Sequence, residues 1–129
     1  MGRGALNGKS LVIIGGTTGL GLSAARAFIE NGARVIIVGR NPENAKAAQK
    51  SLGKSSFALA ADATHPNTAT KAIELALDKF RAFHGLYHVA GGSGRSMGDG
   101  PLHQLTDDGW HATIDLNLTS LIFSNHRGA

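Results

Sequence analysis

The stretch Ile14-Gly15-Gly16-Thr17-Thr18-Gly19-Leu20-Gly21 determines how the rest of this chain is interpreted. It follows a short apolar run, residues 10–14, and precedes an Ala-rich segment whose apolar side chains have helical spacing. Its glycines allow a tight turn, a close approach of another backbone and tight packing of a helix on a strand. A helix that begins here points its free N–H groups and positive dipole end at an anion, usually a phosphate. The alternative is a glycine-rich turn that binds no ligand.

Short buried strands alternate with helices along the whole chain. Four apolar runs, residues 10–14, 33–38, 55–61 and 85–90, lack the alternation of a one-sided sheet and predict strands buried on both faces. Helices are expected at residues 19–31 and 42–52, from Pro66 to Phe80, and from Thr106 to near Ala129. This order predicts an α/β fold, a doubly wound, Rossmann-like sheet of four parallel strands in the order 3-2-1-4 with helices on both faces.

Composition limits the class of protein. The 129 residues, of which 42% are hydrophobic, suffice for one domain spanning residues 1–129. There is no cysteine, no apolar segment of signal-peptide length and no run near the ~20 residues of a membrane span, so we expect a cytoplasmic protein away from membranes. The formal charge is +4, but the Lys and Arg residues are scattered, so we expect no nucleic-acid partner.

The context of the glycine-rich turn favours a dinucleotide ligand. A strand precedes the turn and a helix follows it within a βαβ unit, which is where dinucleotide-binding folds hold a pyrophosphate. The spacing Gly-x-x-x-Gly-x-Gly makes a wider loop than the common Gly-x-Gly-x-x-Gly pattern, and two threonine hydroxyls can add donors to the backbone N–H groups. The loop residues expected to contact the cofactor are Gly15, Thr17, Thr18, Gly19, Leu20 and Gly21.

The end of the second predicted strand favours NADP(H) over NAD(H). An acid at this place would accept hydrogen bonds from the adenosine ribose, but the chain has Gly39 and Arg40 there. No carboxylate repels a 2′-phosphate, and a guanidinium is present to pair with one. The alternative is a surface arginine that follows a strand.

Two further strand ends contribute to the same predicted site. Asp62, with Ala63 beside it, follows the third strand and can accept a hydrogen bond from the adenine amino group; equally, it can be the acid that starts the next helix. Ala90 and Gly91 end the fourth strand, and their small side chains leave room for the cofactor. An ordinary turn would explain this pair as well.

These features together resemble the N-terminal half of a short-chain dehydrogenase/reductase. The resemblance runs from about Lys9 to Ser124 and includes Asp115-Leu116-Asn117-Leu118-Thr119 on the last predicted helix. It implies that the loop glycines hold the pyrophosphate, Arg40 the 2′-phosphate and Asp62 the adenine, with Ala90 and Gly91 along the cofactor. It also implies that Asn117 is a catalytic residue that supports an active-site water in a proton relay.

The chain departs from the family pattern in several places. Ile14 replaces the usual Thr before the first glycine, and His88-Val89 replaces the usual Asn-Asn. Catalysis in the family uses a Ser and a Tyr with a Lys four residues later, because the ammonium lowers the pKa of the phenol. Here the single tyrosine, Tyr87, is followed four residues on by Gly91. We therefore expect a truncated chain that lacks the catalytic Ser and the Tyr-x-x-x-Lys part.

Three functions follow from this pattern. The first is an NADP(H)-dependent oxidoreductase with weak or oligomer-dependent activity on a carbonyl/alcohol pair. The others are a non-catalytic NADP(H)-binding pseudoenzyme and an oligomerising structural fragment. Self-association is expected through the last helix, whose apolar stripe includes Trp110, Ile114, Leu118 and Leu121, or through the edge of the fourth strand. The six histidines show no helical metal spacing, so no metal site is expected.

Overall fold

Four parallel strands form one sheet in the computed structural model, which describes residues 4–129; the first three residues of the expected domain lie outside it. The strands are β1 (Ser10–Ile14), β2 (Arg34–Gly39), β3 (Ser56–Ala60) and β4 (Gly85–His88), in the order β3-β2-β1-β4. The predicted topology is therefore confirmed. All four strands point the same way, so their carboxyl ends gather at one edge of the sheet.

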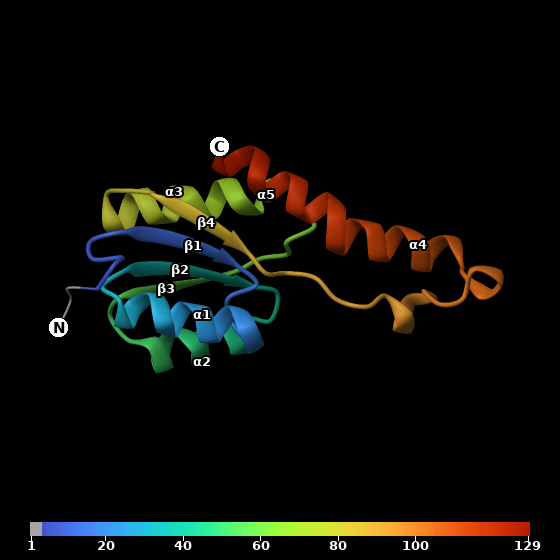
Figure 1. Ribbon diagram of the computed structural model, residues 1–129, viewed down its shortest axis with the longest axis horizontal. Coiled ribbons are helices and arrows are strands. Elements are labelled where there is room, and N and C mark those ends of the chain that lie inside the picture. The colour runs from blue at the N-terminus through green and yellow to red at the C-terminus, as the bar shows by residue number, and fades with distance from the viewer. Residues whose placement is uncertain (1–3) are drawn as a thin grey trace.

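Helices cover both faces of this sheet, as Figure 1 shows. On one face lie α1 (Gly19–Glu30) and α2 (Pro42–Leu52), and on the other lie α3 (Thr68–Phe80) and α5 (Ser120–Gly128). Successive residues of the central strands are buried on opposite sides, Val12 and Ile14 against α3 and Ile13 with Ala25 of α1. Burial on both faces explains why these strands read as continuous apolar runs.

Local signals set the helix starts with one exception. The Asn41 side chain caps α2 by accepting hydrogen bonds from the backbone N–H groups of Glu43 and Asn44 at 2.8 and 3.1 Å. The expected start of α3 at Pro66 is wrong, because the helix begins at Thr68. Residues 62–67 instead form a turn in which Asp62 O accepts from His65 N at 3.0 Å and from the Thr68 hydroxyl.

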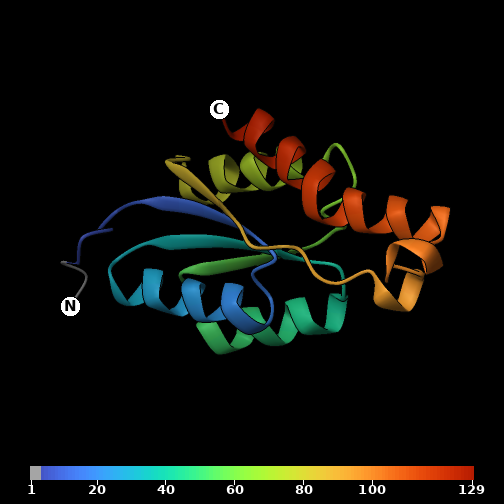
Figure 2. The ribbon, with the colours of Figure 1, turned by 45° about the vertical axis from the view of Figure 1, so that its right-hand side comes forward.

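The last predicted helix is continuous in the structure, but its hydrogen-bonding pattern changes in the middle. It consists of α4 (Asp107–Ile114), a π-helical turn at Asp115–Thr119 and α5, joined without a break. Figures 1 and 2 show that α5 packs beside α3, whereas α4 and the loop before it extend beyond the sheet as an arm. That loop includes two 3-10 turns, Arg95–Met97 and Leu102–Gln104.

The apolar stripe of this helix is only partly covered, as expected. Trp110 and Leu118 are 52% and 51% exposed, and Ile122 is 56% exposed. The positions that α5 buries are instead two serines, Ser120 and Ser124. Periodicity of apolar residues therefore did not identify the face that meets the sheet.

Strand β4 pairs with β1 and with no other strand of residues 4–129, so it is an edge strand. None of the helices within residues 4–129 combines the length and hydropathy needed to cross a membrane.

Candidate functional site

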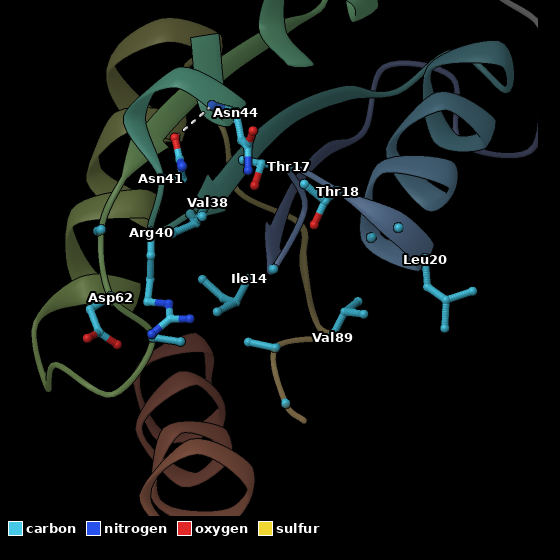
Figure 3. Close-up of a pocket in the computed structure, with 18 of the residues that line it drawn as sticks. Ile14, Thr17, Thr18, Leu20, Val38, Arg40, Asn41, Asn44, Asp62 and Val89 are labelled. Atoms are coloured by element: carbon cyan, nitrogen blue, oxygen red, sulfur yellow. Dashed lines mark hydrogen bonds between the residues drawn. The ribbon is translucent and has the colours of Figure 1, made fainter. Parts of the chain in front are cut away.

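A cavity of about 590 Å³ lies at the carboxyl edge of the sheet (Figure 3). It is lined by every residue that the sequence predicts to contact a cofactor. These are Gly15, Thr17, Thr18, Gly19, Leu20, Gly21, Arg40, Asp62, Ala63, Ala90 and Gly91. They come from four separate segments, which the parallel sheet brings together because each follows the end of a strand.

The sequence did not identify the remaining residues of the cavity. They are Ile14, Val38, Asn41, Asn44, Ala61, Val89 and Leu116; Gly39, which the sequence places beside Arg40 at the end of the second strand, lines the cavity as well. Most of them end a strand or follow one. Because the strand ends of a parallel sheet meet at one edge, these residues could have been predicted from their positions in the sequence. The position of strand ends could not predict Leu116. It belongs to the π-helical turn, which reaches the cavity from a distant part of the chain.

Three glycines of the loop, Gly15, Gly19 and Gly21, each have a structural reason. Gly15 adopts a left-handed φ of +91°, and a Cβ on it would lie 2.6 Å from the backbone nitrogen of Ala90. Gly19 also has a positive φ, +52°, where it begins α1. A Cβ on Gly21 would overlap the carbonyl of Gly15, so the first turn of α1 packs directly on the loop. A left-handed φ or a close backbone contact therefore explains glycine at each of these three positions.

The start of α1 leaves donors available for an anion. Its N-cap residue, Thr18, makes no side-chain capping hydrogen bond, and the first turn has no acidic residue. The first backbone N–H groups of a helix have no intrahelical partner and lie at the positive end of the dipole. This end of the cavity can therefore hold a phosphate group.

Thr17 and Gly39 are in contact at the end of β2. Thr17 is buried, with 7% of its surface exposed, and its side chain fills the space beside Gly39. Thr17 also lines the cavity, so the same residue packs on Gly39 and borders the candidate site. This packing was not predicted from the sequence.

Arg40 and Asp62 lie on the same side of the cavity, and Figure 3 shows the Arg40 side chain extending toward Asp62. The guanidinium forms no ion pair with a carboxylate of residues 4–129. Asp62 Oδ1 accepts hydrogen bonds from the Thr64 backbone N–H at 2.9 Å and the Thr64 hydroxyl at 2.8 Å. The backbone bond is the main cause of a lowered pKa of Asp62, partly opposed by burial and supported by the charge of Arg40.

These contacts show what Asp62 does in the turn before α3. It does not cap α3, because the N-cap residue of that helix is Asn67. Asp62 closes the turn that precedes α3, and the hydrogen bonds of its side chain are made by one of its two carboxylate oxygens. Asp62 also lines the cavity.

Asn117 lies next to the cavity and forms hydrogen bonds with the backbone of Gly92, which follows the lining residue Gly91. Its Nδ2 donates to Gly92 O at 2.7 Å and to Thr113 O at 3.0 Å, and its Oδ1 accepts from Gly92 N at 3.0 Å. Both amide protons are used, and one acceptor position on Oδ1 is left. A Cβ on Gly91 would lie 2.8 Å from Asn117 Oδ1, which explains a small residue at that position.

The other candidate groups lie elsewhere. Tyr87 is half-exposed on β4 and packs against Phe28 of α1 with ring centroids 6.0 Å apart, outside the cavity. Within residues 4–129, no three His, Asp or Glu side chains come close enough together to hold a metal ion.

Comparison with known proteins identifies related sequences over nearly the whole chain. A family model described as short chain dehydrogenase matches residues 9–127. The chain is 35% identical over 123 residues to the 3-oxoacyl-[acyl-carrier-protein] reductase FabG of Chlamydia pneumoniae, which covers 92% of this chain and 48% of that protein. It is 32% identical over 117 residues to serine 3-dehydrogenase of Agrobacterium fabrum, covering 91% and 46%.

A solved structure shows the same fold. The short-chain dehydrogenase/reductase of the glucose/ribitol dehydrogenase type from Brucella melitensis superposes with a TM-score of 0.86 at 25% identity, covering 98% of this chain and 51% of that one. The chain thus spans about half the length of the curated relatives it matches.

Proposed function

Because this chain belongs to the short chain dehydrogenase family, we propose that it binds a nicotinamide dinucleotide in the cavity at the carboxyl edge of its sheet, and NADP(H) in preference to NAD(H). The observation that carries this proposal is the convergence of the eleven predicted residues on one cavity. The loop and the start of α1 would hold the pyrophosphate, and Ala90 and Gly91 would lie along the nicotinamide half.

The preference for NADP(H) rests on Arg40. Its guanidinium is exposed at the cavity and unpaired by any carboxylate of residues 4–129, so it is available for a 2′-phosphate. The neighbouring Gly39 has no side chain that could bind the ribose of NAD(H). Asp62 feels the charge of Arg40, which contributes to its lowered pKa, and its carboxylate would accept a hydrogen bond from the adenine.

We further propose that redox activity of this chain on a carbonyl/alcohol pair is weak or depends on association. A bound nicotinamide supplies the hydride. A proton donor for the carbonyl oxygen is also needed, and the Ser and Tyr-x-x-x-Lys that the family resemblance implies are not among these 129 residues. Asn117 would contribute by holding a water, using the acceptor position that Gly92 leaves on Oδ1.

Association through the exposed stripe of α4 and α5, or through the edge of β4, is part of the proposal. Exposed apolar side chains on a helix and unpaired strand edges are both surfaces that pair with another chain. A cytoplasmic location, expected from the cysteine-free sequence, also belongs to the proposal.

Calorimetric titration of the chain with NADPH and NADH tests this function. We expect wild-type protein to bind NADPH more tightly, and Arg40→Gln to weaken NADPH binding about tenfold or more with little effect on NADH, because a charge-assisted hydrogen bond is lost. Arg127→Gln, on the exposed end of α5, is the matched control for the loss of one positive charge. Equal loss for both cofactors would contradict the role of Arg40, and no binding of either cofactor would leave the structural fragment as the function.

A further inference from the structure

His88 connects the wall of the cavity to helix α5. It is the last residue of β4, and its ring is partly buried between that strand and the helix. Its Nε2 lies 3.0 Å from the carbonyl oxygen of Ala90, and its Nδ1 lies 2.9 Å from Ser124 Oγ. The Ser120 hydroxyl lies 3.4 Å from Nε2 and donates to the Leu116 carbonyl.

These partners specify one form of the ring. A carbonyl oxygen can only accept, so the proton must be on Nε2, which donates to Ala90 O. Nδ1 of the neutral ring is then an acceptor, and the Ser124 hydroxyl donates to it. Burial lowers the pKa of His88, which favours this neutral form.

The buried serines of α5 are explained by the same contact. Ser120 and Ser124 are 0% and 2% exposed, at positions where an amphipathic helix would normally place apolar side chains. Buried hydroxyls need hydrogen-bond partners, and the His88 ring supplies one for Ser124.

The carbonyl held by His88 belongs to a peptide segment that lies directly against the phosphate loop. Ala90 N donates to Ile14 O at 3.0 Å, and Ala90 packs on Gly15 so closely that no Cβ fits between them. Val89, Ala90 and Gly91 all line the cavity. The position of this wall is therefore fixed on one side by β1 and on the other by the ring of His88.

We propose that His88 is a positioning residue of the cofactor site: its ring, protonated on Nε2, ties the Ala90 carbonyl to Ser124 of α5 and thereby holds Ala90 and Gly91 in the arrangement that accepts the nicotinamide dinucleotide. The ligand in this inference rests on the proposed function, whereas the hydrogen-bonded link does not. His88 does not touch the cavity, so its effect is transmitted through the Ala90 peptide.

Two substitutions separate the two halves of the link. In His88→Gln the side-chain Nε2 can still donate to Ala90 O, whereas in His88→Asn the shorter amide can reach Ser124 but not Ala90. We expect NADPH affinity of His88→Gln to stay within about twofold of wild type and that of His88→Asn to fall about fivefold to tenfold, as for the loss of one hydrogen bond. His126→Asn, an exposed histidine of α5, is the control. Equal affinities of the Gln and Asn variants would overturn the proposal.

A spectroscopic measurement tests the link independently of cofactor binding. In the ¹⁵N spectrum of the wild-type imidazole groups, His88 should show a protonated Nε2 and an unprotonated Nδ1, and a proton on Nδ1 would overturn the link. The amides of residues 90–92 should exchange faster in His88→Asn than in His88→Gln. If wild-type protein bound neither cofactor while these results were obtained, the proposed function would fail and the link would stand. If the His88 variants do not fold, Ser124→Ala is tested instead, because it leaves the imidazole ring of His88 in place. Amide exchange of residues 90–92 should also be faster in Ser124→Ala than in wild type. An unchanged exchange rate would contradict the link.

Discussion

The Thr17 side chain occupies the space into which any side chain at Gly39 would project. Thr17 comes from the phosphate loop and Gly39 from the end of β2, 22 positions later in the sequence. Because Thr17 fills this space, the packing of the loop leaves no room for an acidic side chain at the end of β2. A side chain at residue 39 would therefore require the Thr17 side chain to shift or to be replaced by a smaller one.

This contact predicts how cofactor preference can be altered. Gly39→Asp alone should destabilise the protein by about 1–3 kcal/mol through overpacking, and it should not produce tight NADH binding. The double variant Thr17→Gly/Gly39→Asp has room for the carboxylate, so it should bind NADH more tightly than NADPH. Urea unfolding and calorimetry on the four proteins of the double-mutant cycle measure both effects. Additive free energies of unfolding would show that the two residues do not interact.

Gly21 should be the least replaceable glycine of the loop. In Gly21→Ala the methyl group overlaps the Gly15 carbonyl, which is backbone and cannot move aside as a flexible side chain would. We expect a loss of about 3 kcal/mol in the free energy of unfolding. Gly100→Ala is the control, because its Cβ would meet no atom within 4 Å and its φ is not left-handed. Similar unfolding curves for the two variants would refute this explanation of Gly21.

Asn117 should stabilise the cavity wall through its side-chain amide. Asn117→Ala leaves the N–H and C=O of Gly92 without their partner and should cost about 1–3 kcal/mol of stability. Asn117→Asp should cost more near neutral pH, since a carboxylate would face the carbonyls of Gly92 and Thr113. Chemical unfolding at neutral and acidic pH measures these free energies. The extra cost of Asn117→Asp should become smaller at acidic pH, where the new carboxyl group is protonated. A larger cost for the alanine variant at neutral pH would be inconsistent with these contacts.

The carboxylate of Asp62 should stabilise the fold in a pH-dependent way. Its pKa in the folded protein is below the ordinary value of 3.8, so the charged form is favoured by folding. The stabilisation is present above pH 3.8 and is lost as the pH falls through the lower, folded-state pKa. The difference in free energy of unfolding between wild type and Asp62→Asn should therefore shrink over this acidic range. A difference that stayed constant from neutral pH to strong acid would argue against it.

The exposed stripe of α4 and α5 should mediate association. Leu118→Glu places a charge among apolar side chains that are about half exposed, and it should convert an oligomer into a monomer. Leu102→Glu, a more exposed leucine on the arm and outside the helix, should leave the oligomer unchanged. Sedimentation velocity at micromolar concentration distinguishes these states. A monomeric wild-type protein would show that neither the stripe nor the β4 edge pairs with a second copy under these conditions.

The sequence by itself determined the order of the elements and the place of the site. Strands buried on both faces and amphipathic helices are encoded locally, in apolar runs of five to seven residues and in helical spacing. The glycines of residues 15–21 are local as well, because a left-handed φ or the lack of a Cβ is a property of one position. Since all strand ends of a parallel sheet meet at one edge, these signals predicted eleven of the residues that line the cavity, and Leu116 of the π-helical turn was among those they missed.

Only the tertiary structure decided which side chains meet across that edge. The contacts of Thr17 with Gly39, of His88 with Ser124 and of Asn117 with Gly92 join segments 22, 36 and 25 positions apart. The π-helical turn at Asp115–Thr119 and the buried serines of α5 also went unpredicted, because apolar periodicity records only how apolar side chains are spaced. Hydrogen-bond partners and close packing depend on the distance between elements in space, and no spacing along the chain specifies that distance.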